Sequence, residues 1–264
     1  MAEFIPDEYG VTVLAGGHPQ SHIPHDPDFL VFEYMRHLAD ALELVRPAPP
    51  DRIAVTHIGG AGLTLPRYVE HTRPGSPQIV LEPDAALTEA VRAEVPLPRG
   101  HRIRVRATTG EAGIAALRDD TADAVVLDAF AEGQIPAGVT TREFLGEVHR
   151  VLRPGCLFAA NLADAPGLDY VRRVAATAGA AGLTHRVLVA THDVLKGRRF
   201  GNVVLVASDT ELDTDDLSRR LRRSPFPTGM RAGIEAWCRG SALLTEADPA
   251  ASPMAPDLGR WRVR

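Results

Sequence analysis

The chain has 264 residues and a formal net charge of −5, with 45% apolar and 24% charged residues. These values are typical of a globular protein with one large domain and a small appendage. The acidic balance argues against nucleic acid as a partner, because binding to phosphates needs clustered basic side chains. Neither Cys156 nor Cys238 has metal-ligand spacing, and no apolar run approaches the ~18 residues that span a membrane. We therefore expect a cytoplasmic protein that binds no metal, nucleic acid or membrane.

Residues 1–50 predict a short strand, an ordered loop and a helix. An apolar stretch at 11–14 is followed by glycines and prolines up to residue 27, which is typical of a strand that enters a loop. From residue 29 to 45 the apolar residues recur at helical spacing, and three prolines between 47 and 50 end the pattern. We expect this segment to precede the main domain.

Residues 51–208 predict a nucleotide-binding α/β domain, because short β-rich runs alternate with helical runs. Such alternation implies right-handed βαβ units and a parallel sheet. The last two β-rich runs are separated by about twelve residues without a helical pattern, so we expect them to pair antiparallel as a hairpin. The predicted strands lie at 53–58, 78–82, 102–105, 124–128, 157–161, 186–190 and 203–207, and the predicted helices at 63–72, 84–94, 111–118, 141–152 and 167–180.

The predicted fold class is therefore α/β: a doubly wound, mostly parallel seven-stranded sheet of the methyltransferase type that ends in an antiparallel hairpin. Beyond it, residues 209–264 predict a helical C-terminal extension. A charged helix is expected over 213–223 and another near 230–240, before an end rich in proline, alanine and aspartate. We expect this extension to pack loosely.

The first predicted strand of the domain runs into a loop that contains Gly59, Gly60 and Gly62. Glycine lets the chain turn tightly and approach a ligand, and the following helix offers free N–H groups. Glu82 ends the second strand twenty positions after Gly62, where a nucleotide-binding α/β fold places an acid on the ribose hydroxyls. The alternative is an ordinary turn and a solvated glutamate.

Two further acids follow the third and fourth predicted strands. Glu111, two residues after Thr109, could accept a hydrogen bond from an adenine amino group, but it also suits a helix start. Asp128 follows an apolar run directly, and the carboxyl end of a parallel strand faces the crevice where ligands bind. Asp128 is the leading candidate for chemistry; the alternative is a carboxylate that only accepts hydrogen bonds from loop N–H groups.

In this order the motifs resemble those of spermidine synthases and their polyamine aminopropyltransferase relatives, over about residues 11–207. The glycine loop is similar to the family's GGGDGGTL shortened by one residue, and the segment that begins at Leu14 and includes Gly16 and Gln20 is similar to L-D-G-V-x-Q. Glu82-Pro83-Asp84 is similar to E-I-D, Gly110-Glu111-Ala112 to G-D-A/G, and Leu127-Asp128-Ala129-Phe130 to the D-S-S-D catalytic loop.

The resemblance implies a transferase of polyamine biosynthesis, with a homodimer as a possible assembly. It would move an aminopropyl group from decarboxylated S-adenosylmethionine to a small-molecule amine, and no metal is needed. Asp128 would be the catalytic residue, orienting the amine and accepting its proton. The resemblance assigns the nucleotide to Gln20, Gly59, Gly60, Gly62, Glu82, Glu111 and Ala112, and the amine to Tyr34 and Glu132.

Three positions depart from the family pattern. Ala61 lies near the place of the glycine loop's acid, and Ala131 takes the place of the second acid of D-x-x-D, although Glu132 is adjacent. Phe32 falls where the family has a tyrosine, with Tyr34 two positions further on. The nucleotide half of the pattern is therefore preserved better than the amine half.

Two other functions stay open. One is methyl transfer from S-adenosylmethionine itself to an acceptor that is not a polyamine, and the other is nucleotide binding without turnover. Methyltransferases usually carry an acid two residues before the first glycine, where this chain has His57. The residues that follow the fourth strand also do not match the N/D-P-P-Y/F motif of amino-group methyltransferases. Both observations favour the spermidine-synthase-like alternative.

Overall fold

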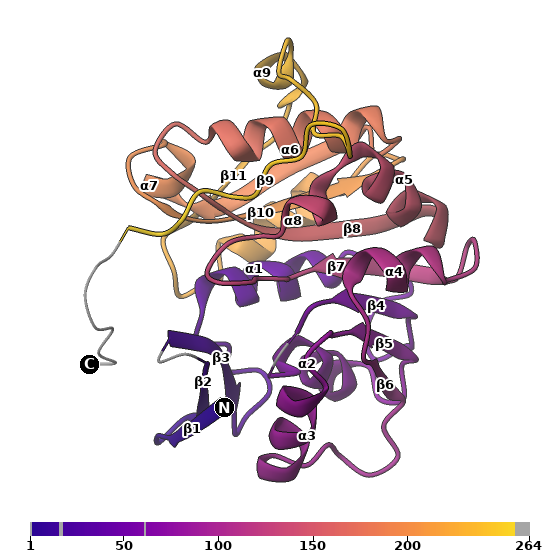
Figure 1. Ribbon diagram of the computed structural model, residues 1–264, viewed down its shortest axis with the longest axis vertical. Coiled ribbons are helices and arrows are strands. Elements are labelled where there is room, and N and C mark those ends of the chain that lie inside the picture. The colour runs from indigo at the N-terminus through magenta and orange to yellow at the C-terminus, as the bar shows by residue number, and fades with distance from the viewer. Residues whose placement is uncertain (1, 16–17, 61, 257–264) are drawn as a thin grey trace.

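The computed structural model describes residues 2–15, 18–60 and 62–256, so Gly16 and Ala61 lie outside the described residues. Figure 1 shows a small N-terminal sheet beside a large sheet that carries helices on both faces. Among the described residues, no helix has both the length and the apolar composition needed to cross a bilayer.

The small sheet contains three antiparallel strands in the order β1-β2-β3. They are β1 (Ala2–Pro6), β2 (Gly10–Ala15) and β3 (His18–Pro24). The expected strand corresponds to β2, but the expected ordered loop after it is wrong, because His18–Pro24 pairs with β2 and buries Ile23. Val13 and Ile23 pack with Val91 of the helix α3 (Ala85–Glu94). The small sheet therefore buries an apolar face of its own, and this burial explains why β1 and β3 form beside β2.

The large sheet has the strand order β11-β9-β10-β8-β7-β4-β5-β6. The strands β6, β5, β4, β7 and β8 are parallel, and β10 pairs antiparallel with both β8 and β9. This confirms the predicted α/β class, the mostly parallel sheet and the antiparallel hairpin. The strands are β4 (Val55–Ile58), β5 (Gln78–Leu81), β6 (Ile103–Arg106), β7 (Ala122–Leu127), β8 (Leu152–Asp164), β9 (His185–Thr191), β10 (Gly201–Ser208) and β11 (Thr228–Arg231).

The sheet has eight strands and not the predicted seven, because β11 pairs with the edge of β9. The helix expected near 230–240 is correspondingly short, since α9 spans only Glu235–Cys238. β11 has only four residues, one of which is a glycine, and its sequence shows no alternating apolar pattern. Its pairing with β9 therefore comes from tertiary contacts that a local pattern does not reveal.

Helices cover both faces of the large sheet (Figure 1). Along β7, Ala124 and Val126 belong to the apolar cluster with α1, while Val125 and Leu127 belong to the cluster with α5 and α6. A central strand that is buried on both faces reads as a continuous apolar run, which is why its sequence shows no alternation. The remaining elements are α1 (Glu33–Leu42), α2 (Thr64–Thr72), α4 (Gly110–Ala115), a 3-10 helix (Ala137–Thr140), α5 (Arg142–Val151), α6 (Asp169–Ala180), α7 (His192–Leu195) and α8 (Thr214–Leu221).

The described part of the C-terminal extension is fixed to the domain and is not loosely packed as expected. Leu217 of α8 is fully buried in the cluster that contains α1. The carbonyl of Leu244 accepts a hydrogen bond from the Arg142 N–H at 2.8 Å, and the Ser252 hydroxyl accepts one from the Ile135 N–H at 2.9 Å. The last of these contacts ties the extension to the segment that follows β7.

Candidate active site

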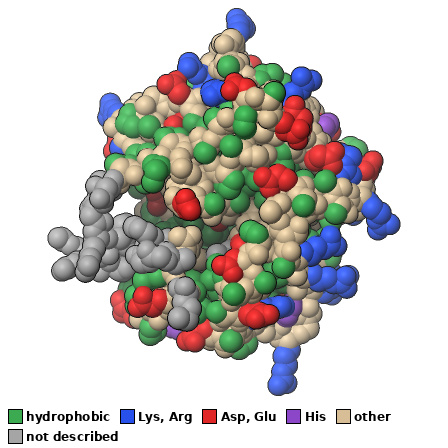
Figure 2. All heavy atoms as spheres, in the orientation of Figure 1, with side chains coloured by type: hydrophobic (Ala, Val, Ile, Leu, Met, Phe, Trp, Pro, Cys, Tyr) green, Lys and Arg blue, Asp and Glu red, His purple; other side chains and the backbone are tan. Residues whose placement is uncertain are grey.

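A cleft of about 560 Å³ lies at the carboxyl ends of β4, β5 and β7. The small sheet and the start of α1 close it from the other side, and Figure 2 shows the molecule hollowed between the small and the large sheet. Of the predicted site residues, the cleft is lined by Gln20, Tyr34, Gly59, Gly60, Glu82, Glu111 and Asp128. Parallel strands that end at one edge therefore bring together residues that are far apart in the sequence, from Gly59 to Asp128.

Two glycines of the loop after β4 allow two different parts of the chain to pack closely against it. Gly59 has φ +81°, and a Cβ there would lie 2.4 Å from the carbonyl oxygen of Asp128. A Cβ on Gly62 would lie 2.2 Å from the Ser21 hydroxyl, so Gly62 admits strand β3. Gly59 and Gly60 line the cleft, whereas Gly62 is not among its described lining residues. The lack of a side chain at Gly62 therefore allows β3 to pack against the glycine loop.

Two hydroxyl groups hold β3 on the first turn of α2, and the sequence did not single them out. Thr64 donates a hydrogen bond to the carbonyl of His22 at 2.8 Å, and its oxygen lies 3.0 Å from the Ser21 hydroxyl. Since the Thr64 proton is used, Ser21 is the donor to Thr64. The neighbouring Gln20 is exposed and lines the cleft.

Glu82 directly follows β5 and is 9% exposed. One of its oxygens accepts a hydrogen bond from the Asp84 N–H at 3.0 Å, while Asp84 in turn caps α3 through the Leu87 N–H. Burial raises the pKa of Glu82. A carboxylate that is fixed and largely removed from water suits the binding of two ribose hydroxyls.

Glu111 lies in the first turn of α4, beside the 3-10 helix. A Cβ on Gly138 would approach a Glu111 carboxylate oxygen to 2.3 Å, so Gly138 allows the side chain to lie there. The hydroxyl of Thr109 accepts a hydrogen bond from the Ala112 N–H at 3.3 Å, which is a helix cap. Ala112 itself is not among the described lining residues. The expected helix start is therefore present at Thr109, and Glu111 lines the cleft.

Asp128 occupies the middle of the cleft, directly after β7. Burial raises the pKa of Asp128 to about 6, and this effect is larger than the lowering of the pKa by the hydrogen bond from Asn161. The Asn161 amide donates to Asp128 Oδ1 at 2.9 Å, and the Asn202 amide donates to Asn161 Oδ1 at 2.9 Å. An ionised carboxylate only accepts hydrogen bonds, so both amides must point their N–H groups toward Asp128. The three residues come from β7, β8 and β10.

Tyr34 lies near Asp128, whereas Glu132 does not line the cleft. Burial, followed by the negative charges of Asp128 and Glu33, raises the pKa of Tyr34 well above its usual value. The ring of Phe32 stacks on that of Tyr34, with centroids 5.8 Å apart. Glu132 is exposed, with φ +52°, in the turn that joins Ala131 to Gln134.

His57, which stands where methyltransferases usually have an acid, is a buried and neutral side chain. Its Nε2 lies 2.9 Å from Gln78 Oε1, and the Gln78 amide donates to the carbonyl of Pro66 at 3.0 Å. That orientation of the Gln78 amide makes His57 Nε2 the donor. Burial lowers the pKa of His57 to about 4, so the ring is uncharged at neutral pH.

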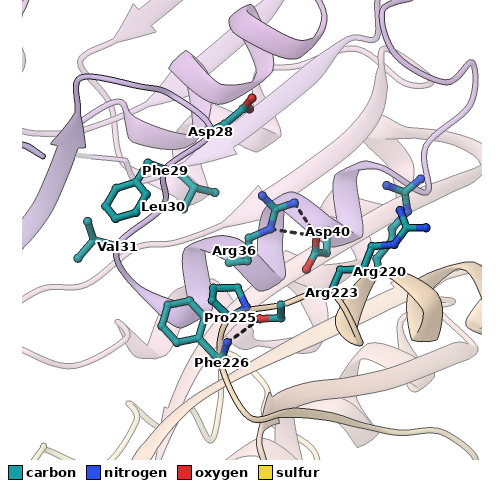
Figure 3. A pocket seen from close by; sticks show the side chains of 11 residues that line it. Asp28, Phe29, Leu30, Val31, Arg36, Asp40, Arg220, Arg223, Pro225 and Phe226 are labelled. Atoms are coloured by element: carbon teal, nitrogen blue, oxygen red, sulfur yellow. Dashed lines mark hydrogen bonds and ion pairs between the residues drawn. The ribbon is translucent and has the colours of Figure 1, made fainter.

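A second pocket lies against α1, where it meets the segment after α8 (Figure 3). It is lined by Phe29, Leu30 and Phe226 on one side and by arginines on the other, and Arg36 donates two hydrogen bonds to Asp40. None of the predicted site residues lines it. Among the described residues, one cluster has metal-ligand geometry: Asp26, Asp28 and His71, all exposed, of which Asp28 also lines this second pocket.

No family model matches the chain. A curated relative, the polyamine aminopropyltransferase of Vibrio vulnificus, is 29% identical over 136 residues. The match covers 50% of this chain and 44% of the relative, so it spans less than half of the relative's length.

Solved structures extend the similarity to nearly the whole chain. A probable spermidine synthase from Corynebacterium glutamicum superposes with a TM-score of 0.85 at 28% identity, covering 93% of this chain and 92% of that one. Human methyltransferase-like protein 13 in complex with SAH has a TM-score of 0.57 at 21% identity, covering 73% of this chain and 94% of that one, and shares the fold alone. The resemblance to spermidine synthases and the methyltransferase-type fold are both confirmed.

Proposed function

We propose, from this resemblance to spermidine synthases, that the chain is an aminopropyltransferase in which Asp128 is the base. The observation that carries the proposal is that Asp128 lines one cleft together with Glu82, Glu111 and Tyr34. With a pKa of about 6, Asp128 is mostly ionised at pH 7 and can accept a proton. The nucleotide would be decarboxylated S-adenosylmethionine, with Glu82 on the ribose and Glu111 at the adenine.

The proposed reaction is a displacement at the carbon next to the sulfonium. The amine nitrogen forms the new C–N bond, the C–S bond breaks, and methylthioadenosine leaves with the electron pair. Free alkylamines resemble lysine, with a pKa of about 10.4, so the acceptor arrives mostly protonated. Asp128 would orient the ammonium group and take its proton directly or through water. Because the sulfonium already activates the carbon, positioning supplies much of the rate.

Calorimetry against three nucleotides tests the proposal. Decarboxylated S-adenosylmethionine and methylthioadenosine are expected to bind more tightly than S-adenosylmethionine. A preference for S-adenosylmethionine would instead support methyl transfer in the same cleft. Binding of none of the three would refute a sulfonium-nucleotide site, and binding without methylthioadenosine release from any amine would leave a nucleotide-binding protein without turnover.

Three further properties stay predictions. A cytoplasmic location is expected from the composition and a possible homodimer from the resemblance, and light scattering of the purified protein tests the second. Independence of metal ions predicts that EDTA leaves turnover unchanged. Gln20, Gly60 and Tyr34, which line the cleft, are proposed to contact the bound molecules. Gly62, Ala112 and Glu132, which are not among the described lining residues, stay predictions: the first two for the nucleotide and Glu132 for the amine.

A further inference from the structure

We infer that the acceptor is a monoamine, that is, a primary amine whose far end carries no second positive charge. This inference rests on the proposed function and deepens it. The carboxylates that line the cleft are unevenly distributed. Glu82 and Glu111 follow β5 and β6, and Asp128 follows β7 in the middle. Beyond Asp128, the described lining residues of β8, β10 and α1 include Asn161, Asn202, Tyr34 and Met35, and no acid.

The two asparagines are committed to Asp128. Asn202 donates to Asn161, and Asn161 donates to Asp128, so each amide directs its positive end toward the carboxylate. These bonds stabilise the anion that receives one ammonium group. The oxygen of the Asn202 amide remains as an acceptor, but it is neutral and offers no counter-charge to a second ammonium.

Three other acids occur on neighbouring elements, but none of them is among the described residues that line the cleft. Asp164, at the end of β8, is 2% exposed and accepts hydrogen bonds from the N–H groups of Ala165 at 2.7 Å and Val171 at 2.8 Å. Glu132 is exposed in its turn, and the charge of Glu33 acts on the neighbouring Tyr34, but neither carboxylate lines the cleft. A second ammonium beyond Asp128 would therefore lose water without gaining a carboxylate, which is unfavourable. The acceptor end of the cleft thus combines one carboxylate, Asp128, with the two amides among its described lining residues.

The test uses the full-length protein and compares acceptors that share the same four-carbon chain. With decarboxylated S-adenosylmethionine, release of methylthioadenosine is measured for 1-aminobutane, 4-amino-1-butanol and 1,4-diaminobutane. We expect a kcat/KM at least tenfold higher for the two monoamines than for the diamine. Equal or higher kcat/KM for the diamine would overturn the inference while leaving aminopropyl transfer intact. Failure of every amine, with the nucleotide bound, would instead refute the proposed function.

Two variants tie the preference to the named charges. Ala131 is exposed and lines the cleft, so Ala131→Asp adds a carboxylate there and should narrow the difference by about tenfold. The matched variant Ala131→Asn adds similar volume without charge and should keep the wild-type preference. If Ala131→Asp and Ala131→Asn behave alike, charge does not set the acceptor class and the inference fails.

Discussion

Replacing Asn161 with leucine should raise the pH at which the enzyme becomes active. Asn161 is fully buried, and its amide donates to Asp128 at 2.9 Å. A hydrogen bond to a charged group contributes about 1.5–3 kcal/mol, and one pKa unit corresponds to ~1.4 kcal/mol. Because the bond stabilises the ionised form, its loss should raise the pKa of Asp128 from about 6 by about one to two units.

The assay is the pH dependence of kcat/KM between pH 5 and 9, which reports groups of the free enzyme and substrate. At pH 7 the variant should have a several-fold lower kcat/KM than the wild type, and the deficit should shrink as the pH rises. Deprotonation of the amine acceptor raises both rates alike, so the ratio of the two profiles isolates the enzyme group.

Asn202→Leu is the matched control, because it removes a bond one step further from the carboxylate. Its profile should move in the same direction by a smaller amount. A uniform loss of activity for Asn161→Leu, with an unchanged ratio across the pH range, would show that Asn161 only maintains packing. Asp128 would then owe its reactivity to burial alone.

The other predictions concern Asp128, Glu82 and the packing of Gly62. Asp128→Asn should abolish turnover while nucleotide affinity by calorimetry stays within a few-fold; equal loss of both would make Asp128 a nucleotide ligand. The folded-state pKa of Asp128, about 6, exceeds the ordinary value of 3.8, so the ionised form destabilises the fold above pH 6 and the penalty disappears as the pH falls toward 4. Asp128→Asn should therefore stabilise the protein at pH 8 by up to about 3 kcal/mol, and thermal melts at pH 5 and 8 should show the smaller gain at pH 5. Glu82→Gln should weaken nucleotide binding by roughly tenfold or more, because the charged acceptor of the ribose hydroxyls is lost, and an unchanged dissociation constant would contradict that role. Gly62→Ala should lower the melting temperature by several degrees, since the new Cβ would lie 2.2 Å from the Ser21 hydroxyl. If that contact is the cause, adding Ser21→Gly should restore part of the lost melting temperature.

The sequence by itself determined the alternation of strands and helices in the main domain, the glycine loop and the acids at the strand ends. Consecutive βαβ units place parallel strands side by side, and their carboxyl ends meet at one edge. Glu82 and Asp128 could therefore be assigned to one crevice from their positions after apolar runs alone. Asp84, Thr109, Thr141 and Asp213 cap the helices that were expected to begin near them. These features depend on local patterns, and local patterns are legible in a sequence.

Only the tertiary structure decided what surrounds Asp128. Asn161 and Asn202 belong to strands that pair antiparallel, and an isolated asparagine in an apolar run has no local signature. The contact of Ser21 with Gly62, and the pairing of β11 with β9, likewise join segments far apart in the chain. Such contacts depend on how the sheet is ordered and closed, so periodicity does not encode them. The positions of the acids could thus be predicted, but the amide chain that tunes Asp128 could not.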